Sequence, residues 1–288
     1  MQVSRVGINQ HSNLNKPVFK GMRFPEDAAY KKLLQQGLKD SFGISCKVED
    51  LESIAGPKEL RFIIGKLKPE HYEIGENFRA NFHMHTSAVD GQMTLDDYLQ
   101  QCVDWANHIF KNPKHRDELP PFSAAITDHD CIINVKKAIA EISQNPEKYK
   151  NFKFVSGCEF LFDARKEQDC CFEAIGLGFN PFDKALEPMT QFRVSKNKVE
   201  DIQKVRDAGG VLSWAHPMYN GNITEEEFAA FLKENGVEGI EGNYQYMIED
   251  KEYADEAKPF VDKWIEKFKF FVTGGTDTHG LTIMRNVK

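Results

Sequence analysis

The chain has 288 residues with a formal net charge of −7, and 41% of its residues are hydrophobic. Its length suits one large α/β domain or two ordinary ones. Its acidic balance argues against a protein that coats duplex nucleic acid through a basic face. No apolar run approaches a membrane span, the first residues lack the apolar core of a signal peptide, and the six cysteines show no CxxC spacing. We therefore expect a cytoplasmic protein with reduced thiols and no membrane partner.

The first 79 residues carry no recognisable chemical motif. Residues 1–22 are rich in Asn and show no sustained periodicity, which predicts a disordered arm. Residues 23–79 are expected to form an N-terminal extension with a structural or regulatory role. Within it, residues 24–42 predict a helix with Pro25 near its first turn, and residues 59–67 are a candidate strand.

From residue 80 onward, apolar strands alternate with amphipathic helices. The predicted strands span residues 80–86, 122–130, 153–160, 171–179, 211–217, 237–244 and 269–280. The predicted helices between them span residues 94–110, 131–143, 196–210, 224–236 and 257–268. Thr94 is the expected N-cap of the first of these helices, with Asp97 three residues later. The alternation predicts parallel βα units, in a barrel or a doubly wound sheet, over residues 80–288.

Side chains able to bind a metal ion gather at the ends of these strands. They are His83, His85, Asp128, His129, Asp130, Glu159, His216, Asp277 and His279. Because the carboxyl ends of parallel strands converge in α/β barrels, residues far apart in the sequence can meet there. A single histidine at a strand end is usually structural, but five of the nine histidines occupy such positions and favour a metal site.

The types of candidate ligand indicate both the metal and the chemistry. Imidazole and carboxylate groups without a thiolate suit Zn, Mn or Fe, and the candidates outnumber the four ligands of a structural zinc. We expect two or three divalent ions that hydrolyse a phosphate ester with a metal-bound hydroxide, which the metal ligands hold in place. No GxSxG motif or P-loop supports a competing mechanism.

Five motifs in a fixed order carry a resemblance to a known family: HMHTSAVDG, ITDHD, SGCEF, WAHP and GGTDTHG. Together they resemble the PHP (polymerase and histidinol phosphatase) family of metal-dependent phosphoesterases. The resemblance covers about residues 80 to 280. It implies a distorted (β/α)7 barrel, which is a TIM-like barrel, with up to three metal ions at the carboxyl ends of its strands. The N-terminal extension would precede this barrel.

The resemblance also implies a set of ligands for each ion. The ligands implied for the first ion are His83, His85 and Asp277. The residue implied to bridge the first and second ions is Glu159, and the histidine implied for the second ion is His216. The residues implied to surround the third ion are Asp90, His129 and His279.

Three carboxylates near these motifs have roles that are less fixed. Asp128 would orient a neighbouring ligand. Asp130 could do the same, but we expect it to be a solvated loop carboxylate. Glu173 stands where family members often have a histidine, so it is either a ligand of the second ion or an ordinary polar strand residue. As a ligand it would shift the preference toward harder ions such as Mn or Fe.

The spelling of the motifs is most similar to the stand-alone branch of the family, which acts on nucleotides or short RNA 5′ ends. The implied substrate is a nucleotide, a nucleoside bisphosphate or an RNA 5′ end, and stable binding of duplex nucleic acid is not expected. Arg193, Lys196 and Arg285 are candidates for contacts with substrate phosphate. The alternatives are a histidinol-phosphate-type phosphatase and a non-catalytic metal-binding barrel that acts as an interaction module.

Overall fold

Seven strands form one sheet that nearly closes into a barrel in the computed structural model of the chain. The structure describes residues 26–112, 122–163, 171–192, 198–218, 226–244 and 251–284. The strands are β1 (Ala80–Asn81), β2 (Phe122–Ile126), β3 (Phe152–Asp163), β4 (Cys171–Leu177), β5 (Val211–Trp214), β6 (Gly239–Tyr244) and β7 (Phe271–Gly275). Strands that are consecutive in the sequence pair in the sheet, and β1 meets β7 where the Phe82 N–H donates to the Gly274 carbonyl. The expected distorted seven-stranded α/β barrel is confirmed.

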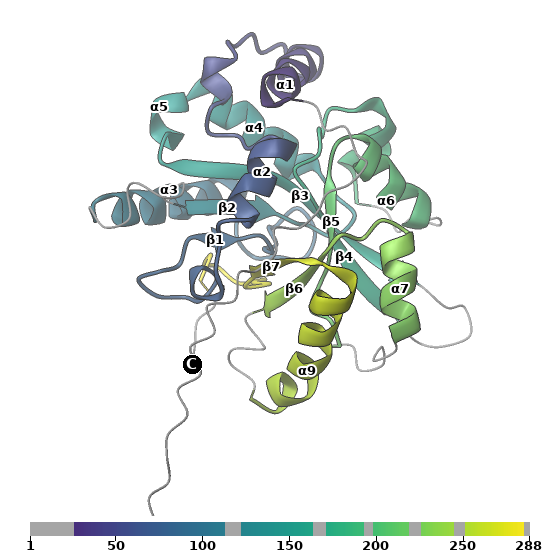
Figure 1. Cartoon of the computed structure of the whole chain (residues 1–288). Coiled ribbons are helices and arrows are strands. Elements are labelled where there is room, and N and C mark those ends of the chain that lie inside the picture. The colour runs from purple at the N-terminus through teal and green to yellow at the C-terminus, as the bar shows by residue number, and fades with distance from the viewer. Residues whose placement is uncertain are drawn as a thin grey trace, which may run out of the picture.

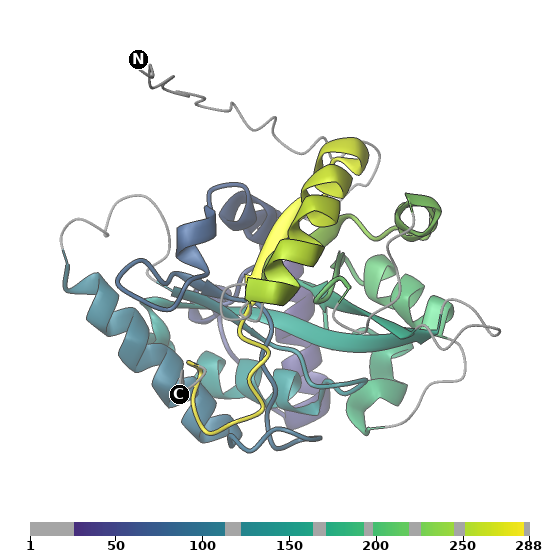
Figure 2. The ribbon, with the colours of Figure 1, turned by 90° about the horizontal axis from the view of Figure 1, so that it is seen from below.

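Most helices lie around the outside of this barrel (Figure 1), which the second view also shows (Figure 2). They are α1 (Asp27–Phe42), α2 (Pro57–Ile64), α3 (Leu95–Phe110), α4 (Ile133–Gln144), α5 (Pro146–Tyr149), α6 (Lys198–Asp207), α7 (Glu226–Glu234) and α9 (Lys251–Phe268), with short 3₁₀ helices η1 (Glu49–Leu51), η2 (Pro69–His71) and η4 (Lys184–Thr190). Helix α3 begins as predicted at Thr94, whose hydroxyl accepts a hydrogen bond from the Asp97 N–H. Over the described ranges, every helix is too short or too polar to traverse a bilayer.

Strand β4 departs from the predicted parallel pattern, because it runs antiparallel to both β3 and β5. A parallel connection needs a crossover of about a dozen residues or more. Between the end of β3 and the start of β4 the chain has only residues 164–170, which is too short for a helix-containing crossover. The prediction of parallel βα units throughout is therefore wrong at this strand. The reversal brings the N-terminal end of β4 to the edge of the barrel where its neighbours have their C-terminal ends.

The candidate strand at residues 59–67 is also wrong, since most of this segment is helix α2. Pro57 lies in the first turn of α2, where its missing N–H costs no hydrogen bond. Leu60, Ile63 and Ile64 are buried and recur at helical spacing. A strand would have pointed Leu60 and Ile63 to opposite faces, so the helix alone lets them share one apolar face.

Helix α2 packs against the interior of the barrel with this apolar face. The interior cluster contains Leu60, Ile63, Ile64, Tyr72, Phe82, Ala125, Val155, Ile175, Leu177, Val211 and Phe271. Just before α2, Ile54 forms a parallel bridge with Phe154 of β3, and the Ala55 N–H donates to the Phe154 carbonyl over 2.9 Å. The described part of the extension is thus built into the packing of the barrel. The arm predicted at residues 1–22 lies outside the described residues.

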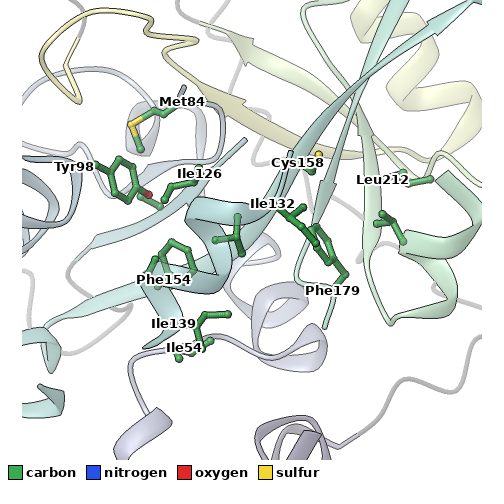
Figure 3. Close-up of a cluster of buried hydrophobic side chains, with 14 of the residues drawn as sticks. Ile54, Met84, Tyr98, Ile126, Ile132, Ile139, Phe154, Cys158, Phe179 and Leu212 are labelled. Carbon is green, nitrogen blue, oxygen red and sulfur yellow. The ribbon is translucent and has the colours of Figure 1, made fainter. Parts of the chain in front are cut away.

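A second apolar cluster lies between the strands and the surrounding helices (Figure 3). It joins side chains of the strands, such as Ile126 and Leu212, to Ile139 of α4. In the same cluster Trp214 of β5 stacks on Trp264 of α9, with ring centroids 4.9 Å apart. The two clusters fix the strands on both of their faces, so the barrel edge that carries the polar residues has a rigid support.

Candidate metal centre

The predicted metal ligands converge at one end of the barrel. The side chains that meet there are His83, His85, Asp90, His129, Glu159, Glu173, His216, Asp277 and His279. Strand alternation explains part of the convergence: Glu159 lies on the face of β3 that also carries the interior residue Val155. The loops after β1 and β7 are held together because the Asp277 N–H donates to the His83 carbonyl and the His85 N–H donates to the Thr278 carbonyl.

Glu173 reaches the site because β4 is reversed. It lies near the N-terminal end of β4, two residues before the interior residue Ile175, so it shares the interior face of the strand. In a parallel strand this position would lie at the opposite end of the barrel. The side chain of Glu173 therefore lies at the site, with its Oε2 2.9 Å from His216 Nε2, and its role as a ligand of the second ion stays a prediction.

Four buried or nearly buried side chains form what we call the inner group: His83, His85, Glu159 and Asp277. His83 Nε2 lies 3.0 Å from Glu159 Oε2 and 3.3 Å from Asp277 Oδ1. His85 Nε2 lies 3.1 Å and 3.2 Å from the same two oxygens, and 3.2 Å from His83 Nε2. Ligands of a tetrahedral ion with bonds of about 2.1 Å lie about 3.4 Å from one another. The donor set and its spacing therefore fit one divalent ion.

The inner group also fits an ion electrostatically, because its carboxylates and imidazoles compensate one another. Burial lowers the pKa of His85, but hydrogen bonds with Asp277 and Glu159 raise it to about 9. Burial also opposes the charge on His83, and Glu159, Asp277 and Glu241 nonetheless raise its pKa well above the ordinary value. The pKa of Glu159 falls well below its usual range, since His83 and His216 outweigh the effect of burial. Protons thus supply the positive charge that a metal ion would otherwise supply.

A middle group adjoins the inner group through Glu159. It consists of His129, Glu159 and Glu173, whose ligand atoms lie within 4.8 Å of one another. His216 borders this group, with its Nε2 3.2 Å from Glu159 Oε1. Burial lowers the pKa of His216, but its contacts with Glu159 and Glu173 raise the pKa to about 10. Glu159 Oε2 thus faces the inner imidazoles and also lies 3.4 Å from His129 Nδ1, whereas Oε1 faces His216.

An outer group lies on the side open to solvent and contains His85, Asp90, His129 and His279. Asp90 Oδ2 lies 3.5 Å from His129 Nε2 and 3.3 Å from His279 Nε2. The side chains of Asp90 and His279 are 43% and 41% exposed, whereas those of the inner group are almost completely buried. His85 belongs to both the inner and the outer group. Because a neutral imidazole has one free lone pair, His85 can bind an ion in only one of them. The role of each residue as a metal ligand stays a prediction.

Asp128 and Asp130 follow the second strand, and both are buried. Asp128 accepts hydrogen bonds from the N–H and the hydroxyl of Thr86, over 2.5 Å and 2.6 Å. It thereby orders the loop just after His85. Both of these hydrogen bonds come from Thr86 and neither comes from an imidazole ring. Burial raises the pKa of Asp128 to about 6, against the lowering effect of Thr86. Asp130 is buried with φ of 48°, so its prediction as a solvated carboxylate is wrong.

Two residues of β6 at the site were missed by the sequence analysis. Glu241 is fully buried, and its Oε2 accepts hydrogen bonds from His83 Nδ1 and the His216 N–H. The hydroxyl of Tyr244 donates to Asp277 Oδ2 over 2.7 Å. The predicted strand at residues 237–244 contains two glutamates, Glu238 and Glu241, and nothing in the sequence distinguishes the one that reaches the site. Arg193, Lys196 and Arg285, the predicted phosphate contacts, lie outside the described residues.

Comparisons with known proteins locate the chain only at the level of distant structural likeness. The sequence matches no protein-family model, and no curated protein matches it significantly. A solved structure from Bifidobacterium adolescentis, provisionally assigned as a metal-dependent phosphoesterase, has 17% identity and a TM-score of 0.49, covering 70% of this chain and 88% of its own. An amidohydrolase from Chromobacterium violaceum, solved with bound sulfate and no metal, has 15% identity and a TM-score of 0.48, covering 70% and 88%.

Proposed function

We propose that this protein is a metal-dependent phosphoesterase that hydrolyses a phosphate ester at a site for two or three divalent ions. The observation that carries the proposal is the sharing of ligands between adjacent groups. Glu159 belongs to the inner and middle groups, and its two carboxylate oxygens can bind two ions. His129 belongs to the middle and outer groups and His85 to the inner and outer groups, and each imidazole can bind an ion in one of its two groups. Shared ligands keep neighbouring ions close, which is the arrangement that supports in-line displacement at phosphorus.

Phosphate is the favoured substrate group because of the number of candidate ion positions. Bound divalent ions would acidify a water molecule and would neutralise the charge on phosphoryl oxygens. An amide or lactone has one carbonyl oxygen to polarise, so it needs fewer positive charges than a phosphoryl group with several anionic oxygens. Three adjoining groups of ligands therefore support phosphoester hydrolysis.

The buried and the exposed side chains of the site would have different roles. Glu159 and Asp277 keep their pKa values low, so they are ionised at neutral pH and can neutralise bound cations. The inner group is closed to solvent and would hold an ion permanently, whereas the exposed Asp90 and His279 border the region that a substrate must enter. We place the substrate phosphate against the middle and outer groups.

The substrate class that we propose is a nucleotide, a nucleoside bisphosphate or an RNA 5′ end. It is supported by the resemblance of the five motifs to the stand-alone PHP branch, and the net charge of −7 agrees with a small substrate rather than duplex nucleic acid. A histidinol-phosphate-type substrate is the second candidate within enzymes. A non-catalytic barrel is disfavoured, since nine residues able to bind metal ions still gather at the site.

The proposal is tested by metal analysis together with a screen for released phosphate. Protein stripped with a chelator is reloaded with Mn²⁺, Fe²⁺ or Zn²⁺ and offered nucleoside 3′,5′-bisphosphates, 5′-phosphorylated RNA oligomers, histidinol phosphate and an aryl phosphate. We expect metal-dependent release from a nucleotide or RNA substrate and loss of it in His83→Ala. Metal uptake without hydrolysis of any of these would favour the binding barrel, and activity that survives His83→Ala would contradict the site.

A further inference from the structure

Glu241 is a buried carboxylate that contacts His83 of the inner group and the backbone of His216, which borders the middle group. It lies in β6, is 0% exposed, and points one oxygen, Oε2, toward the metal centre. That oxygen lies 3.1 Å from His83 Nδ1 in the inner group and 2.9 Å from the backbone nitrogen of His216, which borders the middle group. A carboxylate accepts but does not donate, so Nδ1 of His83 carries the proton and leaves Nε2 free to face an ion.

The second contact of Glu241 falls on a backbone under strain. His216 has φ of 25°, a backbone conformation that residues other than glycine adopt rarely. Such a conformation persists only where surrounding contacts impose it. The hydrogen bond from the His216 N–H to Glu241 is one such contact, since it fixes the peptide that aims the imidazole at Glu159 and Glu173.

Tyr244 supports the inner group from the same strand through its hydroxyl, and its ring lies against the His216 ring, with centroids 5.4 Å apart. Its hydroxyl donates to Asp277 Oδ2, leaving Oδ1 facing His83 and His85. Residues three apart in a regular strand point to opposite faces, so Glu241 and Tyr244 should not both reach the site. A register shift between Glu241 and Asn243 adds one residue and returns Tyr244 to the interior side. The bulge at Gly242 is therefore what lets one strand supply both supports.

We propose that Glu241 is a positioning residue that orients His83 of the inner group together with His216 beside the middle group, and that the Tyr244 hydroxyl orients Asp277 of the inner group. The inference rests on the proposed metal centre and deepens it, by assigning two residues that hold ligands without being ligands. Glu241 accepts hydrogen bonds from His83 and from the His216 N–H through a single oxygen, whereas the Tyr244 hydroxyl donates to Asp277. The variant Tyr244→Phe keeps the ring beside His216 and removes the hydroxyl.

The experiment measures metal binding directly, without reference to activity. Chelator-stripped protein is dialysed against a series of Mn²⁺ concentrations, and elemental analysis gives the ions bound per chain and the stepwise dissociation constants. The variant Glu173→Gln identifies the ion of the middle group as the one whose binding it weakens. Glu241→Gln is expected to weaken both ions by about 10–100-fold, the usual cost of losing a partner behind a metal ligand. Tyr244→Phe is expected to weaken the inner ion alone.

Matched variants separate positioning from general damage. Glu238→Gln makes the same chemical change three residues earlier, at a carboxylate that lies 3.8 Å from Arg61, and should leave both dissociation constants unchanged. Glu241→Asp keeps the charge but draws the oxygen back from the His216 N–H, and should again weaken both ions. Far-ultraviolet circular dichroism of the stripped proteins checks that each variant is folded, and the Asp variant carries the test if the Gln variant is not.

The outcomes distinguish this inference from the function on which it rests. An unsubstituted protein that takes up no Mn²⁺, Zn²⁺ or Fe²⁺ would overturn the proposed function and the inference together. Normal uptake that Glu241→Gln and Glu241→Asp leave unchanged, or weaken for one ion only, would overturn the inference alone. Equal weakening of both ions by Tyr244→Phe would also contradict it, because the division of labour along β6 would then be wrong.

Discussion

The interior of this barrel contains apolar side chains in one part and charged side chains in another. One part is packed with hydrocarbon: Leu60 and Ile63 of α2 meet Val155 and Phe271 of the strands. The part at the site holds buried carboxylates and imidazoles, with Glu159 and His83 almost fully excluded from water. Apolar side chains gain stability from burial alone, whereas buried charges need partners of opposite sign. The apolar part therefore stabilises the fold, whereas the charged part forms the candidate metal centre.

The charged part must be compensated even when no ion is bound. In the stripped protein, protonated imidazoles provide that compensation, which is why contacts with Glu159 raise the pKa values of His85 and His216 to about 9 and about 10 against the effect of burial. An ion that enters displaces these protons. Stability and metal affinity should therefore respond to different substitutions and to pH in different directions.

The largest effect is expected from a substitution in the apolar part, which should change stability without changing metal affinity. Leu60→Ala removes a fully buried side chain of the interior cluster and should lower the free energy of unfolding by about 2–5 kcal/mol. Metal affinity of the folded protein should not change, because no ligand is touched. Denaturant titration and dialysis against Mn²⁺ measure the two quantities. The control Phe62→Ala lies on the same helix but is 60% exposed, and should cost less than about 0.5 kcal/mol.

The converse experiment removes the bridging carboxylate of the charged part. Glu159→Gln should reduce the number of bound ions and lower metal-dependent hydrolysis by more than about 100-fold, since even the loss of a partner behind a ligand costs about 10–100-fold. The melting temperature of the stripped protein should fall, because Glu159 is the carboxylate that compensates the protonated imidazoles of His83, His85 and His216. An unchanged or higher melting temperature would show that the charged part does not need this compensation. Glu147→Gln, at an exposed position of α5, is the matched control.

A smaller effect is expected at the solvent side of the charged part. His279→Ala should lower hydrolysis by about 10-fold and remove at most one ion, because His279 is not among the four ligands of the inner group, although it stacks on His85 and lies 3.6 Å from Asp277 Oδ1. Metal analysis and steady-state kinetics of the same preparation provide the measurement. Loss of all bound ions in His279→Ala would show that the inner and outer groups are not separable, contrary to their difference in burial.

The smallest effect is a change of stability with pH in the stripped protein. The folded pKa values of His85 and His216, about 9 and about 10, lie above the ordinary value of 6.5, so their stabilising contribution is complete below about pH 6.5. It is lost as the pH rises through 9 and 10, and the melting temperature should fall by several degrees over this range. Metal affinity should rise over the same range, because fewer protons compete. Thermal melts with a chelator and with Mn²⁺ test both slopes.

Sequence reasoning worked where the signal is local or periodic. The seven strands and the N-cap Thr94 follow from alternation and capping, and both are present in the structure. It failed at α2, where a short apolar run is ambiguous between strand and helix until its packing partners are known. It also failed at Asp130, since burial of a loop carboxylate depends on what packs over it.

The candidate site shows the same difference between residues with a local signal and residues whose position depends on tertiary packing. His83, His85 and Glu159 could be identified because their residue types are unusual at the ends of apolar strands. Glu241 could not, because a single acidic residue inside a strand has no meaning until its oxygen is found between His83 and the His216 N–H. The assignment of Glu173 was left open, and the reversal of β4 is what brings it to the site.

Local patterns in the sequence indicated which residue types could bind metal ions and which segments from residue 80 onward are strands, because strand alternation and ligand chemistry depend on neighbouring residues. The direction of β4, the bulge in β6 and the packing of α2 into the barrel became known only from the tertiary structure. Each of these depends on contacts between segments far apart in the chain. Distances of about 3 Å between buried charges are set by the barrel as a whole, and no local pattern encodes them.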